Sequence, residues 1–360
     1  MTTQQTGKLT KAQQVQLDKQ RNITSILRGV NVQKKFEGKI DTITYPNALD
    51  DDPYAVIVQA IDDGCTVIFT TSPRLQQASL RAAITHPELV IMNCSLNQSH
   101  RYIRSYYARM YEAKFILGAL AASLSTSHEI GYIASLPTHG ILSDINAFAI
   151  GASIIDQQSR IKLLWGLQKD VDLEMGLKNV ELLSGTLDRN PKDPSREYGL
   201  YRKTVDGKLE SLAMPAWNWG EYYIRIIRSV LSGSYEREKV DCVAVRYYYG
   251  LSSNVIDVVL SEKLDYRSKK LVTALKNAIA TGQINPFGGE IHTQRGILQT
   301  EGRLSEDDQI AMGWLCDNVD GEIPAYDTIL PYAKDYSAII AAGFIFQILT
   351  CGMAGLIRAD

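Results

Sequence analysis

Two short turns, "TTSP" (70–73) and "SLPTHG" (135–140), have the composition of ligand-binding turns. Each follows a β-branched run and precedes a helical pattern, and Ser72 before Pro73 is typical of a helix start with a capping hydroxyl. Both turns are therefore predicted at the carboxyl ends of strands, where open α/β sheets bind ligands beside free helix N–H groups. Because "SLPTHG" lacks the glycines and the lysine of a phosphate cradle, we expect a mostly uncharged ligand.

The sequence lacks the motifs of the common catalytic and cofactor sites. It has no P-loop, no Gly-x-Gly-x-x-Gly turn after an early strand and no Gly-x-Ser-x-Gly elbow. The five histidines lack metal-ligand spacing, and the five cysteines include no Cys-x-x-Cys pair. Cys94 and His100 could act as nucleophile and base, but Cys94 ends an apolar strand pattern and is expected to pack. We therefore expect no catalytic residues, no metal and no cofactor.

Two aromatic clusters stand at predicted strand ends. One is "WNW" (217–219), beside Pro215 at an expected crossover, and the other is "YYYG" (247–250). Aromatic side chains in a cleft between domains stack on planar ligands and bury much of their surface. The alternative, that these rings fill the core behind a hinge, is equally compatible with the sequence.

The order of local signals alternates strand and helix, which is typical of a parallel α/β sheet. A strand-forming hairpin, 198–202 against 209–212, interrupts this order after a charged, Pro- and Gly-rich stretch. The predicted strands of the alternating part are Asp41–Tyr45, Cys65–Thr70, Leu89–Cys94, Ile130–Ser135 and Ile161–Trp165.

Composition excludes several classes of protein. The chain has 360 residues, long enough for two domains, with 45% hydrophobic residues and a formal net charge of -2. That charge argues against nucleic acid as a partner. The polar N-terminus shows no export signal or lipidation cysteine, so the chain reads as cytoplasmic unless its signal is missing from this sequence. Residues 336–357 are uncharged over the length of a membrane span, and a buried closing helix is the favoured reading over membrane contact.

Several segments, in order and spacing, resemble a known family. They are "YYARMYEAKFILGALAASLS", "IGYIASLPTHGILSDINAFAIGASIID", "MPAWNWGEYYIRIIRSVLSGSY", "YYYGLSSNVIDVVL" and "LKNAIATGQINPFGG". Together they look like the basic membrane protein family of ABC-transporter solute-binding proteins, which includes purine nucleoside receptors. The similarity covers roughly residues 41–289.

The resemblance implies a fold and a domain organisation. The expected fold is α/β, with two Rossmann-like lobes of a periplasmic-binding-protein fold, a hinge and an interlobe cleft. The expected division of the chain comprises an N-terminal arm (1–22), lobe 1 (23–123 and 213–240), lobe 2 (124–212 and 241–335) and an apolar C-terminal segment (336–360).

The resemblance also implies non-catalytic binding of a small ligand, usually a nucleoside, for delivery to an ABC permease or for sensing. A cell-surface lipoprotein is the matching location. Carried over by position, the candidates that line the cleft are Thr70, Thr71, Ser72, Ser95, Tyr107, Thr138, His139, Trp217, Trp219 and Tyr248.

The chain departs from the family pattern at three places, which leaves the ligand open. The usual first strand and its Asp-Gly-x-Phe-Asn type loop are missing, because "QRNITSILRGVNVQKKFEG" (20–38) reads as helix. A strand that commonly ends in a sugar-binding aspartate ends here in "NCS" (93–95), and "REYGLYRKTVDGK" (196–208) replaces a stretch that usually carries another acid. Two other hypotheses therefore remain: a relative that acts as an interaction protein without a small-molecule site, and an enzyme of nucleoside or sugar metabolism.

Overall fold

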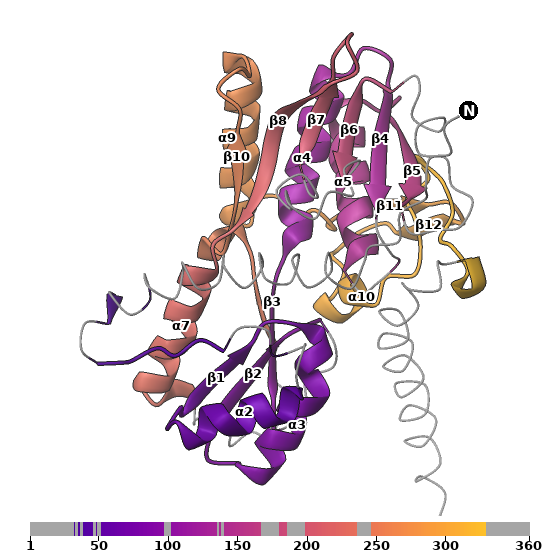
Figure 1. Ribbon diagram of the computed structural model, residues 1–360. Helices are drawn as coiled ribbons and strands as arrows, with labels where there is room; N and C mark the ends of the chain where they lie inside the picture. The colour runs from indigo at the N-terminus through magenta and orange to yellow at the C-terminus, as the bar shows by residue number, and fades with distance from the viewer. Residues whose placement is uncertain are drawn as a thin grey trace, which may run out of the picture.

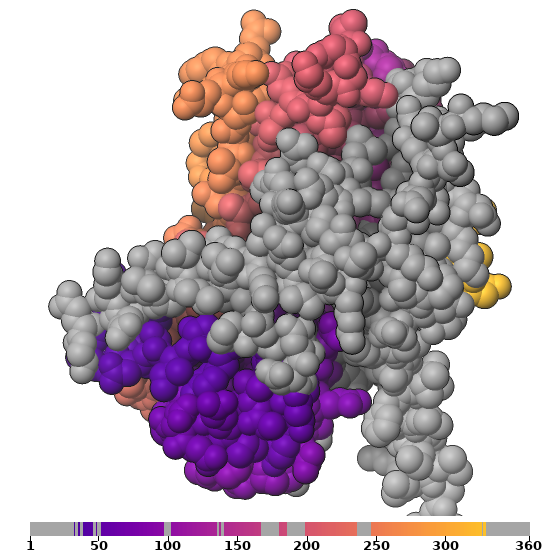
Figure 2. Space-filling model, viewed as in Figure 1, coloured from indigo at the N-terminus to yellow at the C-terminus, as the bar shows by residue number. Residues whose placement is uncertain are grey.

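Two β-sheets, each covered by helices, make up two lobes of the chain (Figure 1). The computed structural model describes residues 52–96, 102–134, 140–166, 180–185, 199–235 and 246–328, together with Pro137 and some positions between 32 and 48. In Figure 2, residues 52–96 of the first lobe are the indigo to purple atoms at the bottom, and α9 (Tyr266–Ala280) of the second lobe is orange at the top. The predicted two-lobed α/β fold class is confirmed.

The first lobe contains a four-stranded parallel sheet in the described part of the chain, in the order β1-β2-β3-β9. Its strands are β1 (Val67–Thr70), β2 (Val90–Cys94), β3 (Arg104–Ala108) and β9 (Arg246–Tyr249). The covering helices are α2 (Pro53–Asp62), η1 (Pro73–Leu75), α3 (Gln76–Thr85) and α7 (Trp219–Leu231).

Alternating side chains direct the two faces of this sheet to different helices. Ile68 and Ile91 pack in one cluster with residues of α2 and α3. Phe69 and Tyr106 point to the opposite face, where both rings contact Tyr223 of α7. Successive strand residues face opposite sides of a sheet, and a parallel sheet covered on both sides is therefore apolar on both.

The second lobe contains a seven-stranded mixed sheet among the described residues, in the order β10-β8-β7-β6-β4-β5-β13. The β7–β8 pair is the antiparallel hairpin predicted from the sequence. The strands are β4 (Glu129–Ala134), β5 (Arg160–Trp165), β6 (Leu182–Gly185), β7 (Leu200–Lys203), β8 (Leu209–Trp217), β10 (Ile256–Leu260) and β13 (Val319–Asp320). The remaining elements are α4 (Met110–Leu124), α5 (Ile141–Ile155), η3 (Leu251–Ser253), α9, β11 (Ile291–Thr293), β12 (Gly296–Gln299), α10 (Glu306–Ile310) and η4 (Tyr326–Thr328).

Helices α4 and α5 cross very closely in the core of the second lobe. A Cβ atom on Gly118 would lie 1.9 Å from the carbonyl oxygen of Phe148, and one on Gly151 would lie 2.1 Å from that of Phe115. The two helices therefore touch backbone to backbone at two glycines. This contact fixes the position of the first turn of α5, which follows the "SLPTHG" turn.

Within the described residues, the chain crosses between the two larger sheets three times. It passes from β3 to α4 at Arg109, from β8 to α7 at Asn218, and from β9 to β10 through η3. These crossings differ from the predicted lobe division, since β9 lies within 241–335 but pairs with β3, and α4 lies within 23–123 but packs on α5. We propose crossing points at Arg109, Asn218 and Gly250 for the two lobes.

The strand predicted at Asp41–Tyr45 is wrong, because these residues are in no sheet. They run alongside the first lobe as an extended segment whose Tyr45 hydroxyl donates a 2.6 Å hydrogen bond to Asp63. The predicted N-terminal arm (1–22), most of the predicted helix 20–38 and the apolar segment 336–357 lie outside the described residues. In the described part of the chain, no helix has the length and apolarity needed to cross a membrane.

Candidate functional site

A hydrogen-bond network joins the ends of β1 and β2 at the carboxyl edge of the first sheet. The Asn93 side-chain amide donates to Thr70 Oγ1 at 2.8 Å and to the Ser72 carbonyl oxygen at 2.8 Å. Thr70 Oγ1 in turn lies 2.9 Å from Ser79 Oγ. Because the Ser72 carbonyl only accepts, the amide nitrogen of Asn93 must face it, which fixes the opposite direction for Asn93 Oδ1.

Two polar atoms at the end of β2 are buried without a hydrogen-bond partner among the described residues. They are Asn93 Oδ1 and Ser95 Oγ, and both residues have 0% exposure. A buried polar group without a partner costs about 1–3 kcal/mol, so native proteins keep few of them. The unpaired acceptor and hydroxyl at this strand end are therefore the polar groups to test for a ligand.

This strand end touches the second lobe. Leu96, the residue after Ser95, lies so close to Gly140 that a Cβ atom on Gly140 would be 2.5 Å from Leu96 Cδ1. Gly140 has φ +84° and precedes the first turn of α5. The residue that follows Ser95 thus lies beside Gly140, which precedes α5. That the two turns bind a ligand together remains a prediction.

Aromatic rings cover the α7 side of the first sheet. Trp219 packs against Tyr106, Tyr222 and Tyr223, with ring centroids 6.1, 5.7 and 6.5 Å away. The Tyr222 hydroxyl donates to the carbonyl oxygens of Tyr107 (3.1 Å) and Tyr247. Burial raises the pKa of Tyr222 well above that of a free tyrosine, which keeps this hydroxyl a donor. Trp219 is thereby part of a packed cluster that begins at the crossing from β8.

A second aromatic contact spans the crossing from β3 to α4. Tyr248 is 6% exposed and its ring lies 6.2 Å from that of Tyr111, which packs on Phe287 at 5.1 Å. Burial raises the pKa of Tyr248, and the nearby hydroxyl of Tyr111 and carboxyl of Asp144 raise it further. The end of β9 is therefore close to the first turn of α5.

Asp144 and Lys114 form a buried pair of ionisable groups in the second lobe. Lys114 of α4 is 1% exposed, and Asp144 in the first turn of α5 is 8% exposed. Burial raises the pKa of Asp144 while Lys114 opposes the rise, and burial lowers the pKa of Lys114 while Asp144 opposes the fall. Each charge is thus tolerated because the other is present.

A second buried carboxylate, that of Glu112, joins two of the three crossings between the lobes. Glu112 pairs with Arg109 at 2.9 Å and accepts a 2.7 Å hydrogen bond from the Leu251 N–H group. Burial raises the pKa of Glu112, and Arg109 and the Leu251 N–H group lower it in part. The Arg109 N–H group also donates to the Tyr249 carbonyl at 2.7 Å, so two of the three crossings are tied together.

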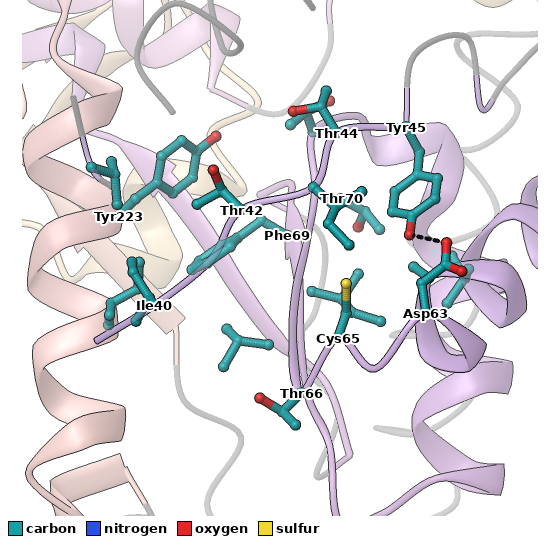
Figure 3. Close-up of a pocket in the computed structure, with 18 of the residues that line it drawn as sticks. Ile40, Thr42, Thr44, Tyr45, Asp63, Cys65, Thr66, Phe69, Thr70 and Tyr223 are labelled. Carbon is teal, nitrogen blue, oxygen red and sulfur yellow. Dashed lines mark hydrogen bonds between the residues drawn. The ribbon is translucent and has the colours of Figure 1, made fainter. Parts of the chain in front are cut away.

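A cavity of about 830 Å³ lies in the first lobe (Figure 3). Its walls are the extended segment 39–45, the strand β1 and residues of α2 and α7. Thr70, Thr71 and Ser72 line one end of it. One end of the cavity therefore lies at the carboxyl end of β1.

The predicted site residues fall into three groups. Thr70, Thr71, Ser72, Ser95 and Tyr107 lie at the carboxyl edge of the first sheet, and Trp217, Trp219 and Tyr248 lie at the crossings. Thr138 and His139 lie outside the described residues. The role of each as a ligand contact remains a prediction.

Sequence reasoning missed Asn93, Glu112, Lys114 and Asp144. The signal for Asn93 was present, since an amide inside the apolar run "VIMNC" is rarely buried without a specific partner. The charged residues gave a similar signal within two apolar helices. The sequence does not show which residues pair with them, because these partners are distant in sequence and meet only in the folded chain.

Comparison with known proteins agrees with the resemblance seen in the sequence. Residues 18–167 match the model of the Bmp family, described as ABC transporter substrate-binding protein PnrA-like. The resemblance to the basic membrane protein family is confirmed. The matched residues include β1 to β5 and the carboxyl ends of β1, β2 and β3.

Two curated relatives of this chain are described as binding different ligands. A purine-binding protein of Brucella abortus is 24% identical over 280 residues, covering 72% of this chain and 77% of the relative. A putative ABC transporter glucose-binding protein of Haloferax volcanii is 21% identical over 288 residues, covering 76% of this chain and 70% of the relative. A solved structure, a transcriptional activator of the comK gene from Bacillus halodurans, shares the fold with a TM-score of 0.55 and 16% identity, over 74% of this chain and 96% of that one.

Proposed function

We propose that this protein binds a small, mostly uncharged ligand between its lobes, with a nucleoside or related purine as the first candidate. The proposed role is non-catalytic delivery to an ABC permease or ligand sensing. The observation that carries the proposal is the pair of buried atoms Asn93 Oδ1 and Ser95 Oγ, which have no partner among the described residues and stand at the end of β2. The next residue, Leu96, lies beside Gly140 of the second lobe.

The chemistry of these atoms restricts the ligand. Asn93 uses its amide nitrogen on Thr70 and Ser72, so its Oδ1 offers only an acceptor. Ser95 Oγ offers a donor and an acceptor. A ligand that brings O–H or N–H donors, such as a sugar hydroxyl or an exocyclic amine, satisfies both, whereas a fully ionised phosphate group supplies no donor for Asn93.

The relatives agree with this chemistry. The protein from Brucella abortus binds a purine and that from Haloferax volcanii is described as binding glucose, and each ligand supplies N–H or O–H donors. A nucleoside combines a purine with a hydroxylated sugar, which makes it the first candidate to test. The family match also supports a cell-surface lipoprotein over the cytoplasmic location.

The test is a thermal-shift screen of the purified chain against nucleosides, free bases and sugars, followed by calorimetry on each hit. A ligand at 100 times its Kd stabilises the fold by about 2.7 kcal/mol, which raises Tm by several degrees. Ser95→Ala is expected to weaken binding about tenfold or more, because it removes a hydrogen bond in a buried site. In the absence of ligand, Ser95→Ala is expected to leave Tm unchanged or to raise it, because the Ser95 hydroxyl makes no hydrogen bond among the described residues.

The matched control is Ser153→Ala, which removes a hydroxyl bonded within α5 to the Ile150 carbonyl at 2.9 Å. It is expected to leave binding unchanged. Equal affinity of Ser95→Ala and the wild type would contradict the proposed site. A flat screen on folded protein would favour the hypothesis of an interaction protein, and turnover of a hit would favour the enzyme.

A further inference from the structure

The cavity in the first lobe lies beyond the free edge of β1. In the described part of the chain, β1 pairs with β2 on one side only. The Val90 N–H group donates to the Thr66 carbonyl, so the even-numbered residues of this stretch direct their backbone groups to β2. Because successive residues of a strand direct these groups to alternate sides, Val67 and Phe69 direct theirs into the cavity.

The helices around this cavity extend past the edge of the sheet. Val56, Ile57 and Ala60 of α2 line it on one side, and Tyr223, Ile227 and Val230 of α7 line it on the other. These are the helices that cover the two faces of the first sheet. On the β1 side, α2 and α7 therefore extend beyond the last strand of the sheet and leave space between them.

The strand residues at this edge are incompletely buried. Val67, Ile68 and Phe69 are only partly buried, whereas every residue of the neighbouring β2 is buried. A parallel strand with helices on both faces is normally buried throughout. All three residues line the cavity, so a strand placed there beside β1 would bury their exposed surface.

The outer wall is an extended segment held at a distance from β1. Ile40–Tyr45 lines the cavity, and the Tyr45 hydroxyl bonds Asp63 at the end of α2 (Figure 3). The bond to Asp63 is the largest of several effects that raise the pKa of Tyr45, so the phenol remains a donor across the physiological range. The cavity is thus bounded on both long sides by extended chain.

We propose that this cavity receives an extended, predominantly apolar peptide segment of another polypeptide, which adds a strand beside β1. Main-chain groups of Val67 and Phe69 supply the ladder, and α2 and α7 cover the two faces of the added strand, so its side chains on both faces are apolar. Lys39, Asp41 and Asp63 are the charged residues of the lining, and Asp63 is bonded to Tyr45. Because the residues that α2 and α7 contribute to the lining are apolar apart from the Tyr223 hydroxyl, the segment is expected to be uncharged over the four residues that match β1, about 13 Å of strand.

The chemistry of the walls favours a strand over a small molecule. The edge of β1 presents backbone donors and acceptors at every second residue, a spacing that another strand reproduces and a compact ligand does not. This site adjoins the proposed ligand site at Thr70 and Ser72, but the added strand uses Val67 and Phe69 and not Asn93 or Ser95. Failure of one proposal leaves the other unaffected.

The test uses a displayed library of random heptapeptides selected on the full chain, followed by fluorescence anisotropy with the selected peptides. Val67→Pro removes an N–H group directed into the cavity and leaves the β1–β2 ladder intact, since proline is tolerated on edge strands. We expect uncharged, apolar peptides to be selected and to bind Val67→Pro at least tenfold more weakly. Peptide binding is also expected to slow alkylation of Cys65, a partly buried free cysteine that lines the cavity.

Ala60→Leu provides a second variant if Val67→Pro does not fold. Ala60 is 4% exposed and lines the cavity from α2, so the larger side chain narrows the space without changing the backbone of β1. It is also expected to weaken peptide binding at least tenfold. Selection of no peptide by folded protein, equal binding by a folded variant, or protection of Cys65 by nucleosides instead of peptides would each overturn the proposal.

Discussion

At the scale of single residues, the buried pair of Lys114 and Asp144 is the most sensitive point of the second lobe. Neither side chain is accessible, and both come from helices that touch at Gly118 and Gly151. Removing one member of a buried ion pair costs about 3–5 kcal/mol, whereas replacing both by apolar groups is often neutral or stabilising. The pair is therefore expected to act as a unit.

Lys114→Met is expected to destabilise the fold by about 3 kcal/mol at pH 7.5, while Lys114→Met with Asp144→Leu stays within about 1 kcal/mol of wild type. Without Lys114, the pKa of Asp144 rises further. Stability of the single variant is then retained below about pH 4, where Asp144 is protonated in both states, and is lost as the pH rises. Urea unfolding at pH 4.5 and 7.5 measures this, and a cost that is equal at the two pH values would refute the coupling.

At the scale of elements, the crossing of α4 and α5 decides where α5 begins. The two glycines allow the helices to touch through their backbones, and α5 then begins at Gly140 beside Leu96 of the first lobe. No side chain larger than hydrogen fits at either contact. The position of this helix start thus depends on packing some distance away from it.

Gly118→Ala and Gly151→Ala are each expected to cost about 3 kcal/mol or more of unfolding free energy, because the new Cβ atom would overlap a backbone carbonyl. Gly220→Ala in α7 is the matched control. Its nearest atom is Asn218 Oδ1 at 3.8 Å, so this substitution is expected to be neutral or stabilising by up to about 1 kcal/mol. Chemical denaturation measures all three, and equal effects would mean that the close crossing does not form.

At the scale of the whole molecule, the three crossings form a hinge. Glu112 ties Arg109 of the first crossing to Leu251 of the third, and the Asn218 N–H group donates to the Val255 carbonyl at 2.6 Å. A hinge of this kind allows the lobes to move as bodies around a ligand. The proposed binding function therefore includes a change in the distance between the lobes.

Spin labels at Gln77 in the first lobe and Val205 in the second are expected to report a narrower distance distribution when a saturating ligand is added. Val205 is fully exposed in the hairpin turn, so a label there does not disturb packing. Gly250→Ala would place a Cβ atom 2.3 Å from Glu112 Oε2 and is expected to broaden the distribution and weaken binding. Identical distributions with and without bound ligand would show that binding occurs without closure.

The sequence by itself determined the local elements of this protein. Ser72 caps the helix that begins at Pro73, the hairpin of β7 and β8 forms where the turn signal stood, and "WNW" marks a crossing between lobes. These features follow from short-range rules: capping, turn geometry and the alternation of strand and helix. The family resemblance then supplied the two-lobed fold.

Only the tertiary structure decided which groups meet. Asp41–Tyr45 has a strand composition but lies outside the sheet, because pairing depends on the neighbour and not on propensity. Asn93 and Ser95 become candidates because two of their atoms are buried without partners, and Lys114 meets Asp144 from a helix 30 positions away in the sequence. Burial and pairing are non-local quantities, and they set the energies on which the proposed site depends.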